Sequence, residues 1–364
     1  MRTSPAGRAA GFSLLLFAGL LVLCGCRTTA GDRSEPGHQA WLNGWKATNS
    51  VWRGLHIMLH ADSGARELEQ EFPRLKAAGI NTIIVEVNYC FEFRSHPELR
   101  SASFVTAATA HAMARSAREQ GIRLIPQFNC IGHQSWAQST LPLLVKYPQL
   151  DETPGQYPEN KGIYCRSWCT RNPEVNKVVL PLLDELVEAF EADALHLGMD
   201  EIFLIGSPHC ERCKGRDPGQ LLADAIRGLH DHFSTGRRVE LLLWGDRLLD
   251  AAALGYSEWE AAKNGTHTAL ERIPKDIIIC DWHYAKQEEY RSVPMLARKG
   301  FRVWPSGWQP LDGAVALSKY SREQGRTEPL VMGYLCTTWG KVKTRETADW
   351  PCLVEPLRVW SPPR

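Results

Sequence analysis

The sequence predicts a single (β/α)8 barrel, and three observations lead to this fold class. Short apolar segments typical of strands alternate with longer segments typical of amphipathic helices, and eight such pairs follow one another. The chain has 364 residues, of which 44% are hydrophobic, so it can bury one large core. The first strand is not followed by a glycine-rich phosphate loop, which argues against a doubly wound open sheet, the main alternative.

The expected strands are apolar runs bounded by turn residues. They cover residues 53–59, 81–87, 123–128, 194–201, 239–244, 276–281, 301–304 and 329–336. The expected helices repeat apolar residues every three or four positions, and two of them end at a glycine, Gly121 or Gly300. They cover residues 65–78, 104–120, 174–192, 219–233, 257–272, 288–299, 313–323 and 351–360. We expect one domain over residues 49–364.

The N-terminus has the pattern of a bacterial lipoprotein signal peptide over residues 1–25. Arg2 and Arg8 precede an apolar run, 12–23, that is too short to span a bilayer comfortably. Leu23-Cys24-Gly25-Cys26 then resembles a lipobox with Cys26 as the lipidated residue; cleavage without a lipid is the alternative. Residues 26–48 are polar and rich in small residues, which predicts a flexible tether. The expected location is the bacterial cell envelope, with the lipid as the only membrane contact.

The composition limits the partners of this chain. Its formal net charge of +1 gives no reason to expect nucleic acid or an anionic partner. Its 13 tryptophans are many for this length. Tryptophan is suited to a flat apolar surface that meets a partly polar ligand such as a sugar ring, although several must simply fill the core.

The fourth expected strand carries the most informative stretch of the chain. Leu195, Leu197 and Met199 alternate with a histidine, a glycine and Asp200, which is the period of a strand. Glu201 follows at once, where the chain should leave the strand. Two adjacent carboxylates at this position can serve one small site, with one moving a proton and the other stabilising positive charge. A solvated turn is the simpler alternative.

Polar and aromatic residues also follow the other expected strands. Because the carboxyl ends of all barrel strands meet at one rim, these residues share a candidate active site. They are Glu86, Gly132-His133, Trp244-Gly245-Asp246, Trp282-His283-Tyr284 and Thr338-Trp339.

This pattern resembles the family-20 glycoside hydrolases, the β-N-acetylhexosaminidases, whose fourth strand carries His-x-Gly-x-Asp-Glu, here 196–201. The resemblance covers about residues 53–355 and is closest to the hexosaminidase D branch. It implies that the substrate's 2-acetamido oxygen attacks the anomeric carbon. Glu201 would then be the general acid and base, and Asp200 would orient the acetamido group. Tyr284 would bind the acetamido oxygen.

The remaining residues of the predicted site are substrate-binding candidates. Trp244, Trp282 and Trp339 would wall the pocket, which excludes water from a reactive intermediate. The other candidates are Glu86, Asp246, His133 and His196. The two histidines have an alternative as buried residues that brace the loops.

The predicted function is therefore a retaining exo-β-N-acetylhexosaminidase that removes terminal β-linked GlcNAc or GalNAc and requires no cofactor. A catalytically weak glycan-binding lipoprotein on the same barrel and a glycosidase of other sugar specificity are the alternatives. The chain departs from the family pattern at two positions. Many members have an arginine at the end of the first strand, where this chain has Met58-Leu59-His60. Many have a glutamate after the last strand, where it has Gly340-Lys341.

The cysteines predict a second site. Cys165 and Cys169 lie after the third strand, and Cys210 and Cys213 lie after the fourth. Neighbouring rim loops can bring these four thiols together as ligands of a structural zinc ion. Disulfides or free thiols are favoured over zinc, because disulfides are the usual state of cysteine pairs in exported proteins. We expect the remaining cysteines of the domain to be small buried apolar residues; they are Cys90, Cys130, Cys280, Cys336 and Cys352.

Overall fold

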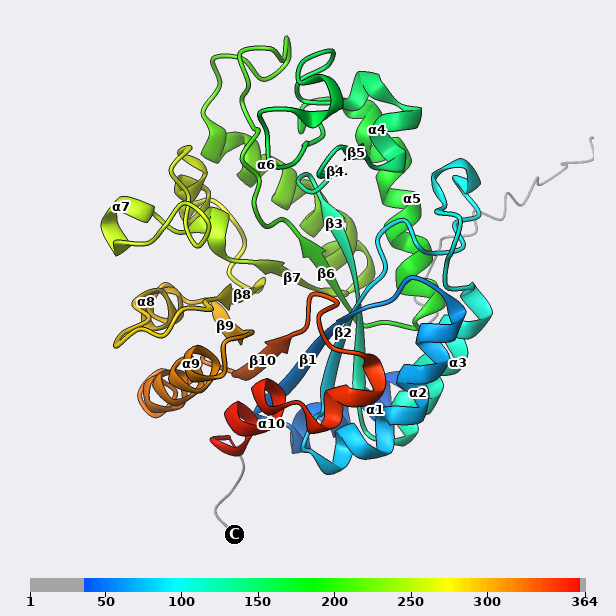
Figure 1. The fold of residues 1–364 in the computed structure, drawn as a ribbon, viewed down its shortest axis with the longest axis vertical. Coiled ribbons are helices and arrows are strands. Elements are labelled where there is room, and N and C mark those ends of the chain that lie inside the picture. The colour runs from blue at the N-terminus through cyan, green and yellow to red at the C-terminus, as the bar shows by residue number, and fades with distance from the viewer. Residues whose placement is uncertain (1–35, 361–364) are drawn as a thin grey trace, which may run out of the picture.

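The computed structural model describes residues 36–360, which form eight parallel strands closed into a barrel (Figure 1). In chain order the barrel strands are β1 (Trp52–Met58), β2 (Thr82–Glu86), β3 (Arg123–Cys130), β6 (Ala194–Gly198), β7 (Glu240–Trp244), β8 (Ile278–Trp282), β9 (Arg302–Gly307) and β10 (Gly333–Thr337). The last strand pairs with the first, with Trp52 opposite Gly333, and this pairing closes the barrel. The predicted (β/α)8 fold is confirmed.

Helices surround the barrel, and their starts follow from local sequence. Asn172 and Asp217 each accept a hydrogen bond from the backbone N–H two residues later, and each precedes a proline that fits the first helical turn. The helices between or after the strands are α2 (Asp62–Ala77), α3 (Ala107–Glu119), α5 (Pro173–Ala189), α6 (Pro218–His230), α7 (Ala251–Leu254), α8 (Ser292–Arg298), α9 (Leu311–Gln324) and α10 (Pro351–Arg358). The connection from β3 to α5 also holds α4 (Pro142–Lys146) and a hairpin of β4 (Ser135–Trp136) and β5 (Ser139–Thr140).

The prediction of a flexible tether is wrong for residues 36–48, which form helix α1 (Pro36–Thr48). Its side chains close the amino-terminal end of the barrel. Trp45 packs edge-on against Trp52, the first residue of β1. Arg123, the first residue of β3, lies with its guanidinium over both rings and pairs with Asp193 at 2.9 Å. Residues 1–35, including the signal peptide and Cys26, lie outside the described residues.

A helix over 257–272 was also a wrong prediction. Within residues 257–272 the structure has a 3-10 turn over Thr266–Glu271 as its only helical segment, and the short α7 ends before this range. The carbonyls of Glu258 and Trp259, which an α-helix would use internally, accept hydrogen bonds from Arg247. Gly265 then adopts a left-handed conformation, with a φ of 86°, before the 3-10 turn. The predicted helix is replaced by a loop that packs at the barrel rim.

A large aromatic ring fills the barrel interior below the rim. Trp304 of β9 is fully buried, and its Nε1 donates to the carbonyl of Trp52 at 3.2 Å. A Cβ at Gly54 of β1 would lie 2.1 Å from that ring, so only glycine fits there. The barrel is therefore a packed core, and any ligand site must lie at a rim.

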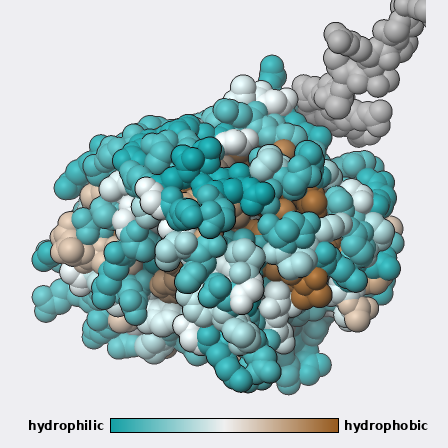
Figure 2. Space-filling model, turned by 90° about the horizontal axis from the view of Figure 1, so that it is seen from above, coloured by the Kyte–Doolittle hydropathy of each residue, from teal (hydrophilic) through white to brown (hydrophobic). Residues whose placement is uncertain are grey.

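Among residues 36–360, no helix combines the length and apolar character needed to cross a bilayer. The face shown in Figure 2 is mainly hydrophilic, with hydrophobic residues in small separate groups.

Candidate active site

The structure brings Asp200 and Glu201 to the carboxyl-terminal rim, directly after β6. The backbone there is tightly turned, because Gly198, Met199 and Glu201 all have positive φ values, of 65°, 68° and 50°. A Cβ at Gly198 would lie 2.4 Å from Asn129 Oδ1 of β3, so glycine is required for this close approach. Non-glycine residues rarely adopt this conformation, and such strain is concentrated at functional sites.

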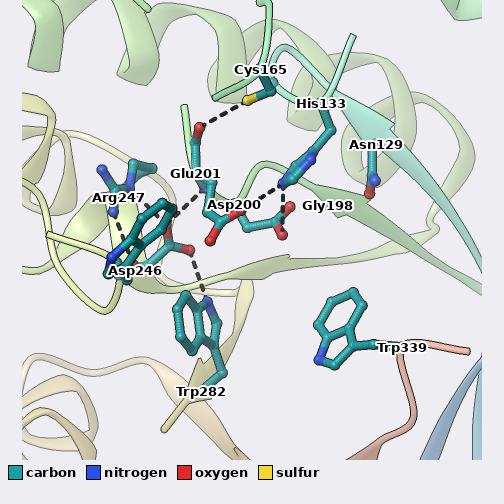
Figure 3. A network of polar contacts seen from close by, with 12 residues as sticks. Asn129, His133, Cys165, Gly198, Asp200, Glu201, Asp246, Arg247, Trp282 and Trp339 are labelled. Carbon is teal, nitrogen blue, oxygen red and sulfur yellow. Dashed lines mark hydrogen bonds and ion pairs between the residues drawn. The ribbon is translucent and has the colours of Figure 1, made fainter. Parts of the chain in front are cut away.

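His133, from the loop after β3, lies against both carboxylates (Figure 3). Its Nε2 is 3.2 Å from Asp200 Oδ2 and 3.2 Å from Glu201 Oε2. Burial lowers the pKa of His133, but the neighbouring carboxylates outweigh burial and hold this pKa well above its usual value. A histidine and two acids with this separation form a compact group for proton transfer.

Asp246, which follows β7, fixes the position of Glu201 through the backbone. Its Oδ2 accepts hydrogen bonds from Glu201 N at 2.9 Å and from Arg247 Nε at 2.6 Å. Its Oδ1 accepts from Trp282 Nε1 at 3.1 Å. Burial raises the pKa of Asp246 to about 6, against the effect of Arg247. Asp246 therefore positions Glu201, and its predicted contact with substrate stays a prediction.

The predicted aromatic residues gather on the other side of the carboxylates. Figure 3 shows Trp282 and Trp339 on the side opposite His133. Tyr284 stacks on Trp282 with ring centroids 4.9 Å apart and accepts a hydrogen bond from Trp339 Nε1 at 2.8 Å. Trp244 is fully buried beneath them, 5.5 Å from Trp339 between ring centroids. Burial raises the pKa of Tyr284 well above its usual value, so its hydroxyl keeps its proton.

His196 lies inside the barrel as a support for the turn. Its Nδ1 accepts a hydrogen bond from Gly198 N at 3.0 Å, and burial lowers its pKa well below 6.5, so the ring is neutral. It also packs against Trp244. This geometry favours the bracing alternative for His196.

Glu86 ends β2 and belongs to a polar cluster inside the rim. Its Oε2 lies 2.9 Å from His56 Nε2 and accepts from Gln127 Nε2 at 2.8 Å. Its Oε1 accepts from Asn88 and Asn129. Through Asn129 this cluster reaches the turn at Gly198.

Several aromatic residues that the sequence did not identify stand beside Glu201. Tyr164 lies 6.0 Å from His133 and 5.0 Å from Trp259 between ring centroids, and Phe203 packs against both Tyr164 and Trp259. Trp259 is 43% exposed and Trp136 is 61% exposed. Tyr164, Phe203 and Trp259 come from three irregular loops, and Trp136 comes from the short strand β4. Their only sequence signal is that large aromatic residues occur there among polar ones.

The structure separates the four cysteines that were predicted to share a site. Cys169, Cys210 and Cys213 lie together, with Glu152 as the fourth member of the group. Cys165 is not part of it, because its Sγ points to the carbonyl of Glu201 at 3.5 Å. No disulfide links any of the nine cysteines within 36–360. The other five are buried as predicted, except for the half-buried Cys90.

The chain matches a family model and a set of solved structures. Residues 53–346 match the model described as glycosyl hydrolase family 20, catalytic domain. The Flavobacterium johnsoniae chitobiase matches with a TM-score of 0.61 and 19% identity, over 85% of this chain and 48% of that one. A Bacteroides fragilis β-N-acetylhexosaminidase matches with a TM-score of 0.59 and 15% identity, over 85% and 66%. Dispersin B matches with a TM-score of 0.51 and 15% identity, over 84% and 98%.

The solved structures and the family model support different conclusions about this chain. The chain spans about half to two thirds of the first two of these structures, and at such identities they establish the shared barrel. A comparison with curated proteins gives no significant match. The family model covers most of the chain, including the strand that leads to Asp200 and Glu201. The chain belongs to glycosyl hydrolase family 20.

Proposed function

We propose that this protein is a retaining exo-β-N-acetylhexosaminidase that removes terminal β-linked GlcNAc or GalNAc by substrate-assisted catalysis. The observation that carries the proposal is the placement of Asp200 and Glu201 together at the rim, against His133 and opposite Trp282 and Trp339. The family and the hexosaminidases among its structural neighbours support the same reaction class.

In the proposed reaction, Glu201 donates a proton to the glycosidic oxygen as the bond to the anomeric carbon breaks. The substrate's acetamido oxygen attacks that carbon and gives an oxazolinium-like intermediate. Asp200 orients the acetamido N–H and stabilises the positive charge. Glu201 then takes a proton from the water that opens the ring, and two displacements together retain the configuration. No cofactor takes part.

The aromatic residues and Tyr284 serve the acetamido group in this proposal. Because Tyr284 Oη already accepts from Trp339 Nε1, its own hydrogen can be directed to the acetamido oxygen. Trp282 and Trp339 hold the acetamido methyl and keep water from the intermediate. A protein that only binds glycans has no use for the proton-transfer group at Glu201, which weighs against the binding alternative.

A panel of aryl β-glycosides tests the proposal on the purified full-length chain. The GlcNAc or GalNAc substrate should be cleaved at least about 100-fold faster than the glucose or galactose substrate, since only the former supply the nucleophile. A thiazoline mimic of the intermediate should inhibit the parent and bind the Asp200→Asn variant far less well. Equal rates on glucosides and GlcNAc substrates would disprove acetamido participation, and binding without turnover would favour the glycan-binding alternative.

We also propose that the protein is anchored in the bacterial cell envelope through a lipid on Cys26. The basis is the sequence Leu23-Cys24-Gly25-Cys26 after an apolar run. The Cys26→Ala variant should leave the membrane fraction or fail to mature. Equal membrane partitioning of variant and parent would contradict the anchor.

A further inference from the structure

Three cysteines and one glutamate form a buried cluster that the proposed reaction does not use. Cys169 and Glu152 come from the long connection between β3 and α5, and Cys210 and Cys213 come from the connection between β6 and α6. The four side chains offer ligand atoms that all lie within 4.8 Å of one another. None of the four residues is more than 4% exposed.

The separations within the cluster fit a metal better than a covalent bond. Cys169 Sγ lies 3.4 Å from Cys210 Sγ and 3.5 Å from Cys213 Sγ. A disulfide bond needs about 2.0 Å. Thiolates around a tetrahedral zinc ion at about 2.3 Å lie about 3.8 Å apart, so a small outward movement of the sulfurs would accommodate the ion.

Glu152 supplies an independent sign of a missing ligand. Its Oε1 accepts a hydrogen bond from Ser207 N at 2.9 Å, which fixes the carboxylate between the two loops. Its Oε2 is buried and accepts no hydrogen bond from an N–H or hydroxyl group among the described residues, and the polar groups that face it are the thiols of the cluster. A buried carboxylate oxygen without a partner is costly, and a bound cation beside it removes that cost.

The local backbone suits a metal site as well. Cys210 and Cys213 form a Cys-x2-Cys turn, in which the carbonyl of Cys210 accepts hydrogen bonds from the N–H groups of Cys213 and Lys214. This spacing is typical of structural zinc ligands. A disulfide between any two of the three cysteines would leave one buried thiol and the Glu152 oxygen without a partner.

We propose that Glu152, Cys169, Cys210 and Cys213 bind one zinc ion as a closed structural site. Its four ligands join the loop after β3 to the loop after β6. The first loop also carries His133 and the second carries Asp200 and Glu201, and Cys165 Sγ lies against the carbonyl of Glu201. The metal therefore clamps together the two loops that hold the acid group of the active site.

Elemental analysis of the purified full-length protein tests this directly. About one zinc per chain is expected, and growth with cobalt should give the thiolate-to-cobalt charge-transfer absorption of a tetrahedral cysteine site. Cys213→Ser should lose the metal. Glu152→Gln should release it to a chelator faster than the parent. Cys165→Ser is the matched control, a cysteine of the same loop outside the cluster, and should keep one zinc.

Three outcomes would overturn the proposal. They are metal-free protein with a disulfide among Cys169, Cys210 and Cys213, metal-free protein with three free thiols, and loss of metal in Cys165→Ser but not in Cys213→Ser. If Cys213→Ser does not fold, the zinc content and the cobalt spectrum of the parent still decide. These readouts do not depend on turnover, so a failure of the proposed hydrolase activity would be seen separately.

Discussion

Two histidines at the same end of the barrel each lie between two carboxylates, and their surroundings differ. His283, after β8, has Nδ1 2.9 Å from Glu260 and Nε2 2.9 Å from Ser292 Oγ, and its side chain is fully buried. Ser292 in turn donates to Asp281 at 2.7 Å. His133 lies 3.2 Å from each of its two acids, and its side chain is 14% exposed.

The comparison shows that charge alone does not identify the active site. In both clusters burial lowers the histidine pKa, and the neighbouring carboxylates raise it by more. In the His283 cluster both ring nitrogens are hydrogen-bonded. Asp281 Oδ1, which accepts no hydrogen bond among the described residues, lies 3.2 Å from His283 Nε2, so both carboxylate oxygens of Asp281 face a partner within the cluster. In the His133 cluster Asp200 Oδ1 has no partner among the described residues, and both His133 and Glu201 have positive φ values. Unused polar atoms on a strained backbone are what a substrate site requires.

The largest expected effect comes from replacing Glu201, the acid in the His133 cluster. Glu201→Gln should lower kcat/KM on an oligosaccharide about 10²- to 10⁴-fold, because the glycosidic oxygen is no longer protonated. The loss should be smaller at the cleavage step of an activated aryl glycoside, whose leaving group hardly needs the proton. Steady-state and pre-steady-state rates on both substrates measure this. An equal loss on both would show that Glu201 is not the general acid.

Matched substitutions of the two histidines should separate stability from activity. His283→Gln leaves buried carboxylates without their cation and should lower the free energy of unfolding by about 3–5 kcal/mol, with activity per folded molecule retained. His133→Gln should instead lower kcat/KM about 10- to 100-fold by displacing the acid group, with a smaller loss of stability than His283→Gln, because the His133 side chain is 14% exposed. Denaturant unfolding and kinetics on both variants test the pair. A reversal of the two phenotypes would show that the comparison assigns the clusters wrongly.

The free energy of unfolding should also depend on pH, because His283 titrates in the His283 cluster. The pKa of His283 rises from 6.5 to about 9 in the folded protein, because Asp281 and Glu260 outweigh burial. The proton-bound form therefore stabilises the fold fully below pH 6.5, and this contribution is lost as the pH rises through about 9. Its full size is up to about 3 kcal/mol.

Unfolding measurements across this pH window give the test. Because the pKa of His133 is also raised in the folded protein, His133 adds to the same pH dependence of stability. The measurement is therefore made on proteins that already carry His133→Gln. There, replacing His283 by Gln should remove most of the remaining loss of stability between about pH 6.5 and 9. If the pH dependence persisted in the double variant, other groups would be responsible for it.

The barrel could be predicted because its strands are short apolar runs that alternate with amphipathic helices. The rim could be predicted because the carboxyl ends of the strands in a parallel barrel meet. Asp200, Glu201, His133 and the tryptophans of the wall therefore came together as expected. Helix α1 was missed, although Trp41, Leu42 and Trp45 already have helical spacing. The segment was predicted to be a tether because most of its residues are small or polar, and this composition outweighed the spacing of the three apolar side chains.

The errors at the cysteines and in the loop after β7 have a different cause. The Cys-x3-Cys spacing suggested that Cys165 and Cys169 act together, but the folded chain directs them to different partners. Glu152 is distant in sequence from Cys210 and Cys213 and becomes their neighbour only through packing. Likewise, Arg247 donates hydrogen bonds to the carbonyls of Glu258 and Trp259, which lie in the predicted helix. A local sequence pattern does not reveal such a tertiary contact.

The smallest expected effect concerns Trp259, an exposed aromatic residue near the His133 cluster. Trp259 packs against Tyr164 and Phe203 and keeps 43% of its surface exposed, so it offers a flat platform beside Glu201. A sugar that follows the cleaved bond can stack there, which is worth about 1 kcal/mol. Trp259→Ala should therefore lower kcat/KM for a chito-oligosaccharide about 3- to 10-fold, mainly through KM. The rate on N-acetylglucosaminyl fluoride, which has no following sugar, should be unchanged. If Trp259→Ala lowered the rate on both substrates, Trp259 would instead support the loop that holds Glu201. If the variant and the parent cleaved the oligosaccharide at equal rates, the following sugar would bind elsewhere.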